Sequence, residues 1–215
     1  MMYSELGVLS DVSDLINRCE AECREQFLEI DKISEANSLK VLKAFHDNNI
    51  VEGHFNTTTG YGYNDIGRDV IENVFRDVLG AEDALVRSQF ISGTHALTVC
   101  LFGLLRPGDM LLSISGKPYD TLDEVIGIRE NPSSLKSFDV RYEQIDLIDD
   151  DFDYEKIKKF ISNNKVKVVE IQRSKGYSTR KSLSLDKLSK VISLIKNIDD
   201  DVIIIINHYN NVIIN

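Results

Sequence analysis

A short polar segment, Ser92-Gly93-Thr94-His95, precedes an apolar run and has the residue types of a phosphate-binding site. The leucines after it recur at helical spacing and predict a helix (Leu97, Leu101, Leu104 and Leu105). The first turn of a helix leaves backbone N–H groups without partners and carries the positive end of the helix dipole. Two hydroxyl groups and a glycine add donors and close access to the backbone. The same residues are also ordinary helix caps, so the segment alone leaves both interpretations open.

Tyr119 is the second residue that suggests chemistry. It lies in the loop Gly116-Lys117-Pro118-Tyr119-Asp120-Thr121, after residues 110–114, which read as a buried strand. Ligands of open α/β sheets bind at the carboxyl ends of strands, where an aromatic face can stack on a heteroaromatic ring. A tyrosine that merely packs over its loop is the alternative. Together with the Ser-Gly-Thr segment, Tyr119 favours a phosphorylated, planar cofactor.

The elements that position these residues alternate in type. Residues 84–91 are predicted to form a strand before the first helix, and further strands and helices are predicted over 140–147, 154–163, 166–172, 185–198 and 202–206. Such alternation predicts parallel strands joined by helical crossovers. Continuously apolar strands such as residues 202–206 indicate a sheet covered on both faces. We therefore expect an α/β fold with a mostly parallel sheet and helices on both faces.

The N-terminal quarter has a different pattern. Two amphipathic helices are predicted over residues 15–33 and 38–48, and one apolar stripe consists of Leu15, Cys19, Cys23, Phe27 and Ile30. Residues 57–63 have neither helical nor strand periodicity, which favours an ordered functional loop. Arg68, within a predicted helix over 65–79, could bind a phosphate through its fork of donors or pair with Glu72.

Four motifs carry a resemblance to a known family. They are HFNTTTGYGYNDIGRD (residues 54–69), QFISGTHA (89–96), RPGDMLLSISGKPYDTLDEVIGI (106–128) and IQRSKGYSTRKSLSL (171–185). In this order they resemble the pyridoxal-phosphate (PLP) enzymes of fold type I, the aspartate aminotransferase fold, and most closely the methionine gamma-lyase or cystathionine beta-lyase-like aluminium resistance proteins. The resemblance implies a helical N-terminal arm (residues 1–55) and an incomplete PLP-binding large domain (56–215), with the C-terminal small domain absent.

The resemblance also implies a set of site residues. Phosphate binding falls to Ser92, Gly93 and Thr94, and ring stacking to Tyr119, with His95 as a hydrogen-bonding group behind them. An adjacent subunit would add Arg68 and one of two tyrosines, Tyr61 or Tyr63, while the predicted substrate-binding residues are Arg173 and Tyr177. Asn207 stands where an acid is expected beside the pyridine nitrogen. Asparagine can hydrogen-bond this nitrogen but cannot keep it protonated by charge.

PLP chemistry also requires a lysine that forms the Schiff base and moves the proton. The resemblance places this lysine beyond Asn215, and Lys196 is rejected because it ends a predicted helix before the last apolar strand. We therefore expect a lyase that cleaves carbon–sulfur bonds in amino acids, inactive alone unless a separately encoded C-terminal fragment supplies the lysine. The alternative is a non-catalytic remnant or interaction module of the same fold. A chain that stops here is also expected to expose a strand edge.

Charge and residue composition limit the classes of partner and ligand that the chain is expected to bind. The 215 residues carry a net charge of -10 with dispersed acidic residues, which argues against nucleic-acid binding. Three cysteines without a paired framework indicate reduced thiols, and the histidines lack metal-ligand spacing, so no metal is predicted. No signal peptide or membrane span is recognisable, and we expect a cytoplasmic protein. The family implies a homo-oligomer, dimer or tetramer, acting on a small amino acid.

Overall fold

The computed structural model describes residues 4–60, 63, 65–176, 178–208 and 211–214. The chain divides into two compact units, residues 1–87 and 88–215, which are described separately below. This division differs from the predicted arm boundary at residue 55, and the assignment of the arm and the large domain stays a prediction. Within the described residues, no helix combines the length and the apolar character needed to cross a membrane.

The first unit is helical. Its elements are η1 (Ser4–Leu6), α1 (Ser10–Glu22), α2 (Arg24–Asp47), η2 (Glu52–Phe55) and α3 (Ile66–Leu79). The predicted break between two helices at residues 34–37 is wrong, because α2 runs through this stretch, which contains neither glycine nor proline, and the chain bends at Cys23 instead. The prediction for α3 is confirmed: the Asp65 side chain accepts from the Arg68 N–H, and Gly80 ends the helix in the left-handed region at φ 66°.

Residues 84–91, predicted to form a strand, contain neither strand nor helix. The backbone N–H of Val86 donates to the Glu72 carboxylate at 2.8 Å, and Arg87 pairs with the same carboxylate. Ile91 is 83% exposed. The prediction of a buried strand is therefore wrong. The Glu72 side chain of α3 instead holds this segment through Val86 and Arg87.

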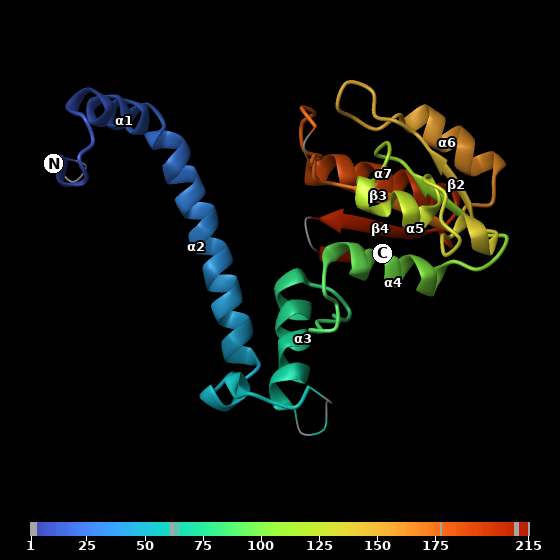
Figure 1. Ribbon diagram of the computed structural model, residues 1–215, viewed down its shortest axis with the longest axis horizontal. Coiled ribbons are helices and arrows are strands. Elements are labelled where there is room, and N and C mark those ends of the chain that lie inside the picture. Colours follow the sequence, from blue (N-terminus) through green and yellow to red (C-terminus); the bar gives the residue numbers. More distant parts are fainter. Residues whose placement is uncertain (1–3, 61–62, 64, 177, 209–210, 215) are drawn as a thin grey trace. The chain divides into compact units, whose positions relative to one another are not determined.

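The second unit is built on a five-stranded sheet (Figure 1). Its helices are α4 (Gly93–Leu104), α5 (Asp123–Ile126), α6 (Tyr154–Asn163) and α7 (Leu185–Ile198), with short turns η3 (Asp120–Leu122) and η4 (Lys136–Phe138). The strands are β1 (Met110–Ser113), β2 (Arg141–Gln144), β3 (Val168–Gln172), β4 (Ile203–His208) and β5 (Asn211–Ile214). The spatial order is β2-β1-β3-β4-β5, and only β5 is antiparallel to its neighbour among these described strands.

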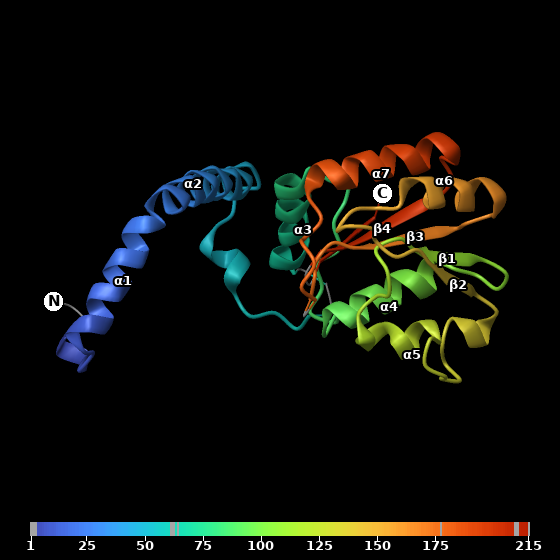
Figure 2. The same ribbon diagram turned by 90° about the horizontal axis from the view of Figure 1, so that it is seen from above.

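Helices cover both faces of this sheet, as Figure 2 shows. Alternate strand residues such as Leu112 and Val169 pack with α6 and α7 in one core, and Leu111 and Val168 pack with α4 and α5 in the other. The bounds predicted for α6 and α7 are confirmed. Strand β5 pairs with β4 from Ile205↔Ile214 to His208↔Asn211, so within the described sheet β5 rather than β4 is the edge strand on this side.

Candidate functional site

The carboxyl ends of β1, β3 and β4 meet at one edge of the sheet, because these three strands are parallel. The start of α4 lies beside the loop that follows β1, since the Thr94 hydroxyl donates to Thr121 Oγ1 at 3.1 Å. Tyr119 immediately precedes η3 in this loop. The helix start and the tyrosine, predicted to act together, are therefore neighbours.

The first turn of α4 presents unused donors. Ser92 caps the helix in an extended conformation, and its Oγ accepts from the His95 N–H at 3.1 Å. The N–H groups of Gly93 and Thr94 have no acceptor among the described residues. These two donors and the helix dipole make the turn suitable for an anion, although the Ser92 hydroxyl is already engaged as a cap.

Tyr119 is fixed at both of its ends. Its backbone N–H donates to Gln172 Oε1 at 2.8 Å, and its hydroxyl lies 2.7 Å from Ser174 Oγ in a hydrogen bond. A Cβ added to Gly176 would lie 2.6 Å from the Tyr119 ring, so glycine is needed for this close approach. The ring is thus held by the strand end of β3 and the loop that follows it.

Buried polar residues support this edge from below. Gln172 and Asn207 are paired in register on β3 and β4, and both are buried. Ser115 Oγ accepts from the Gln172 N–H at 2.7 Å, and Arg180 donates to the carbonyl oxygens of Gln172 and Ser174 at 2.9 and 2.8 Å. Sequence reasoning missed Gln172, Ser174 and Arg180. The available signal was the strand Val-Val-Glu-Ile-Gln, whose polar residues alternate on one face.

Arg173, a predicted substrate-binding residue, already has partners. Its Nε donates to the Leu183 carbonyl at 3.1 Å, and its Nη1 lies 2.9 Å from His208 Nε2. Burial lowers the pKa of His208, and the Arg173 charge lowers it further. A neutral His208 can accept from the guanidinium, so the arginine is anchored at the sheet edge rather than in a free turn.

The other predicted residues divide into two groups. Tyr63, which is 84% exposed, and Arg68 belong to the unit of residues 1–87. The alternative pairing of Arg68 with Glu72 is wrong, because Arg68 Nη1 donates to the Gly60 carbonyl and Glu72 pairs with Arg87. Tyr61 and Tyr177 lie outside the described residues. The functional assignments of all these residues stay predictions.

His95 and Lys196 differ in how far the structure supports their predicted roles. The Nδ1 atom of His95 is buried without a partner among the described residues, and its ring meets Phe90 edge to face, so the hydrogen-bonding role of His95 stays a prediction. Lys196 lies in the last turn of α7, before β4 begins, and its Nζ donates to the Asp200 carbonyl at 3.0 Å. Because β4 follows α7 and runs parallel to β3, this end of α7 lies at the end of the sheet opposite the strand ends that hold Tyr119; the rejection of Lys196 as the cofactor lysine stays a prediction.

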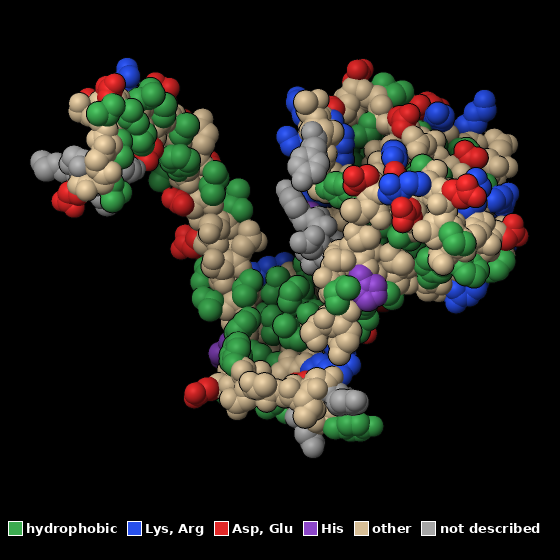
Figure 3. Space-filling model, viewed as in Figure 1, with side chains coloured by type: hydrophobic (Ala, Val, Ile, Leu, Met, Phe, Trp, Pro, Cys, Tyr) green, Lys and Arg blue, Asp and Glu red, His purple; other side chains and the backbone are tan. Residues whose placement is uncertain are grey.

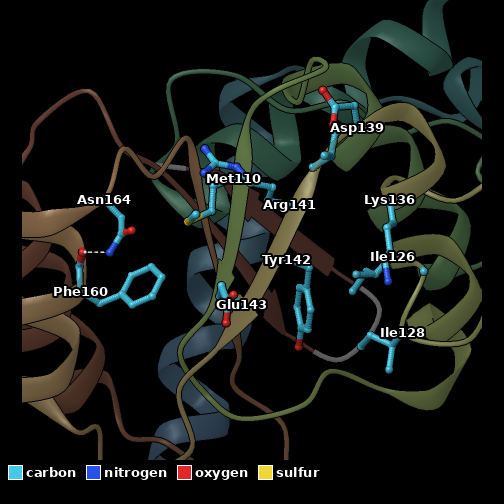
Figure 4. A pocket seen from close by; sticks show the side chains of 12 residues that line it. Met110, Ile126, Ile128, Lys136, Asp139, Arg141, Tyr142, Glu143, Phe160 and Asn164 are labelled. Carbon is cyan, nitrogen blue, oxygen red and sulfur yellow. Dashed lines mark hydrogen bonds between the residues drawn. The ribbon is translucent and has the colours of Figure 1, made fainter.

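A pocket of about 770 Å³ lies beside strand β2, away from these residues (Figure 4). It is lined by residues of β2 together with parts of α5, η4 and α6, including Tyr142, Glu143, Lys136 and Phe160. Figure 4 shows Tyr142 and Phe160 on opposite sides of the strand. None of the predicted site residues is among the described residues that line it, so this pocket and the candidate site are distinct.

The sequence matches the methionine gamma-lyase family over residues 12–214. The protein YnbB of Bacillus subtilis (strain 168) is 45% identical over 192 residues, which cover 88% of this chain and 45% of YnbB. A carbon-sulfur lyase involved in aluminum resistance from Clostridium novyi NT has a TM-score of 0.88 and 40% identity, covering 96% of this chain and 50% of that chain. A candidate cystathionine beta-lyase involved in aluminum resistance from Clostridium acetobutylicum has a TM-score of 0.89 and 38% identity, with the same coverage.

A more distant structure extends the comparison of the fold. The pyridoxal-5'-phosphate dependent protein YhfS from Escherichia coli shares 17% identity at a TM-score of 0.57, covering 80% of this chain and 43% of that chain. The expected fold, an α/β fold of the PLP-dependent type, is confirmed by these structures. The chain spans about half the length of the relatives it matches. Since the family match extends from residue 12 to residue 214, this chain belongs to the methionine gamma-lyase family.

Proposed function

We propose that the chain carries the cofactor-binding half of a PLP-dependent carbon–sulfur lyase that acts on an amino acid. The observation that carries the proposal is the pair of unpartnered N–H groups on Gly93 and Thr94 beside the clamped Tyr119. A phosphate needs such donors, and a pyridine ring needs such an aromatic face. The names of the solved relatives, carbon-sulfur lyase and PLP-dependent protein, support the same reading.

The donor set of the second unit fits PLP. Ser92, Gly93 and Thr94 would hold the phosphate, Tyr119 would stack on the ring, and the buried Asn207 at the end of β4 would hydrogen-bond the ring nitrogen. Bound PLP supplies an electron sink for carbanion chemistry at the α-carbon of an amino acid. The residues of this chain bind and orient the group. Asn207 differs from an acid in that its neutral amide leaves the ring nitrogen without a compensating negative charge.

Catalysis is proposed to need a Schiff-base lysine in addition to the residues of this chain that bind the cofactor. The described lysine that most resembles the family's motif, Lys196, lies at the opposite edge of the sheet. A lysine from another polypeptide segment, which the family resemblance implies, would complete the site. The second candidate function, a non-catalytic module of the same fold, is favoured by the neutral Asn207 at the end of β4.

A homo-oligomer is also part of the proposal. Helix α1 has no buried residue, and α2 has one, Ala44. Large apolar side chains on these helices stay exposed, among them Phe27, Ile30 and Ile33. A second copy that covers them would remove this area from water. Arg68 and the tyrosines of the 57–63 loop, which the resemblance assigns to a neighbouring subunit, belong to the same unit.

A matched pair of serine caps tests the cofactor site. Ser92 caps α4, and Ser184 caps α7, where its Oγ accepts from the Lys187 N–H at 3.3 Å. Each serine-to-alanine change should cost about 1 kcal/mol of stability, since each removes one cap. Only Ser92→Ala should also weaken PLP binding, by about fivefold to tenfold, because it alters the phosphate-binding turn.

The measurement is the change in visible absorption when PLP is titrated into the full chain and into each variant, with inorganic phosphate as competitor. Competition by phosphate and a selective loss in Ser92→Ala support the proposed site. Equal affinities for the two variants, or no saturable binding, contradict it. Activity is then assayed by release of a thiol or sulfide from sulfur amino acids, with and without a second chain that corresponds to the half of the relatives not matched here.

A further inference from the structure

Glu170 is a carboxylic acid in the middle of the sheet, and neither the fold nor the proposed cofactor chemistry accounts for it. It is 2% exposed and lies on β3, paired with Ser113 of β1 and Ile205 of β4. Its Oε2 lies 2.8 Å from Ser113 Oγ, and its Oε1 has no partner among the described residues. An ionised carboxylate in this position would be very costly because it would have one hydrogen bond at most.

The hydrogen-bond geometry indicates where the proton lies. Ser113 Oγ is 2.7 Å from the carbonyl oxygen of Gly116 and 2.8 Å from Glu170 Oε2. A carbonyl oxygen only accepts, and a serine hydroxyl has a single hydrogen to donate. If that hydrogen points to Gly116, the contact with Glu170 is a hydrogen bond only when Oε2 itself carries a proton. A protonated Glu170 satisfies both contacts, whereas a carboxylate satisfies one.

Among the described residues, no lysine or arginine side chain pairs with Glu170. On this face, β2 contributes Tyr142, α5 contributes Asp123 with its partner Lys117, and α4 contributes His95 and Cys100 as titratable groups. Burial raises the pKa of Tyr142, and the charge of Glu170 raises it further, so this neighbour stays neutral. Burial raises the pKa of Glu170 to about 7, and the hydrogen bond from Ser113 only partly opposes this.

We propose that Glu170 is a protonated positioning residue, which through Ser113 fixes the Gly116 carbonyl and with it the turn that presents Tyr119. Gly116 begins this turn at φ 83°, and its N–H donates to the Ile145 carbonyl at 3.0 Å. Tyr119 follows three residues later and is held by Gln172, two residues beyond Glu170 on the same strand. We call this chain of contacts from Glu170 through Ser113 to the Gly116 carbonyl the relay. Its consequence for cofactor stacking rests on the proposed function, but the relay itself does not.

The protonation state is measured on the full chain without cofactor, by infrared spectroscopy at about pH 6 and about pH 8.5. The wild-type chain is expected to show the carbonyl stretch of a protonated carboxylic acid at the lower pH and to lose it at the higher pH. Glu170→Gln should lack this band, and Glu143→Gln, on the exposed strand β2, should retain it. Absence of a Glu170-dependent band at the lower pH overturns the proposal.

The relay is measured by amide hydrogen exchange of the Gly116 and Tyr119 N–H groups, which the structure pairs with Ile145 and Gln172. Glu170→Gln provides a donor at every pH, so it should keep both amides protected, whereas the wild type should exchange about tenfold faster relative to this variant at about pH 8.5. Ser113→Ala should lose protection at both pH values. Equal exchange in wild type and Glu170→Gln at the higher pH refutes the relay. Failure of PLP binding, by contrast, refutes only the proposed function.

Discussion

The two units of the molecule treat apolar side chains in opposite ways. In residues 88–215 the strands β1 and β3 are buried on both faces, and Leu112 of β1 is 0% exposed. In residues 1–87 the long helix α2 leaves Leu42 63% exposed, and hydrophobic side chains lie along α1 and α2 in Figure 3. In a sheet with helical crossovers, the connecting helices cover both faces of the strands. The apolar face of a long helix must instead be covered by a separate element or by another chain. An apolar pattern therefore predicts that a face will be covered, without identifying what covers it.

Matched leucine-to-alanine changes test this contrast most strongly. Leu112→Ala should lower the free energy of unfolding by about 2–5 kcal/mol, because it leaves a cavity in a closed core. Leu42→Ala removes a largely exposed side chain and should cost less than about 1 kcal/mol in dilute solution. Both values come from chemical denaturation of the full chain at low concentration.

Concentration sharpens the same comparison. If a second copy covers α2, the cost of Leu42→Ala should grow as the chain is concentrated, since assembly stabilises the folded state by mass action. Leu112→Ala should show no such growth beyond that of the wild type. A large cost for Leu42→Ala that is independent of concentration would contradict the view that the face of α2 around Leu42 is left uncovered by the described residues.

The next largest predicted effect is the pH dependence of the free energy of unfolding that Glu170 causes. The raised pKa of Glu170, about 7 against an ordinary 4.5, means that the folded state keeps a proton that the unfolded state releases. Stability from this group is therefore complete below pH 4.5 and falls as the pH rises toward 7, by roughly 3 kcal/mol in all. Glu170→Gln should remove this part of the slope in denaturation curves collected across the range. Glu29→Gln, on the exposed surface of α2, is the control and should leave the slope unchanged.

Two glycines offer a smaller contrast between the units. A Cβ added to Gly67 in α3 would lie 2.3 Å from the His54 carbonyl oxygen, and backbone cannot yield as a side chain does. Gly67→Ala should therefore destabilise the packing of η2 on α3 by about 1–3 kcal/mol. Gly103 in α4 has nothing within 4 Å of such a Cβ, so Gly103→Ala should stabilise the chain by about 0.5–1 kcal/mol. Thermal unfolding of both variants gives the two changes in melting temperature. Changes of the same sign contradict the expectation that Gly67→Ala destabilises and Gly103→Ala stabilises the chain.

Much of the second unit could be predicted from the sequence, because its signals are local. The caps Asp153 and Ser184 and the apolar spacing that follows them define α6 and α7. The misread segment 84–91 shows the limit of this reasoning: its apolar residues suggested a strand, but the Glu72 carboxylate, 14 residues before Val86, takes the N–H that a strand would have used. Such a contact leaves no periodic trace in the sequence.

The candidate site was predictable only in part, for a related reason. Ser92, Thr94 and Tyr119 stand at recognisable ends of elements, whereas Gln172 and Ser174 act through contacts with a residue more than fifty positions earlier. Glu170 was visible as a charged letter in an apolar strand. Its protonation and its contact with the turn before Tyr119 depend on the Ser113 hydroxyl of the neighbouring strand β1. Local residue spacing does not predict which strands are neighbours in the sheet.

The smallest predicted effect concerns exposed charges on helix α2. Lys32 and Glu29 of α2 form an ion pair at 2.7 Å, with side chains 70% and 69% exposed. Water and salt screen such a pair, so Lys32→Ala should change the free energy of unfolding by less than about 0.5 kcal/mol. The exception would be informative. A loss that persists in high salt and appears only when the chain is concentrated would place Lys32 in a buried contact between copies, because screening fails where water is excluded. The surface of α2 would then be covered on its charged side as well as its apolar side.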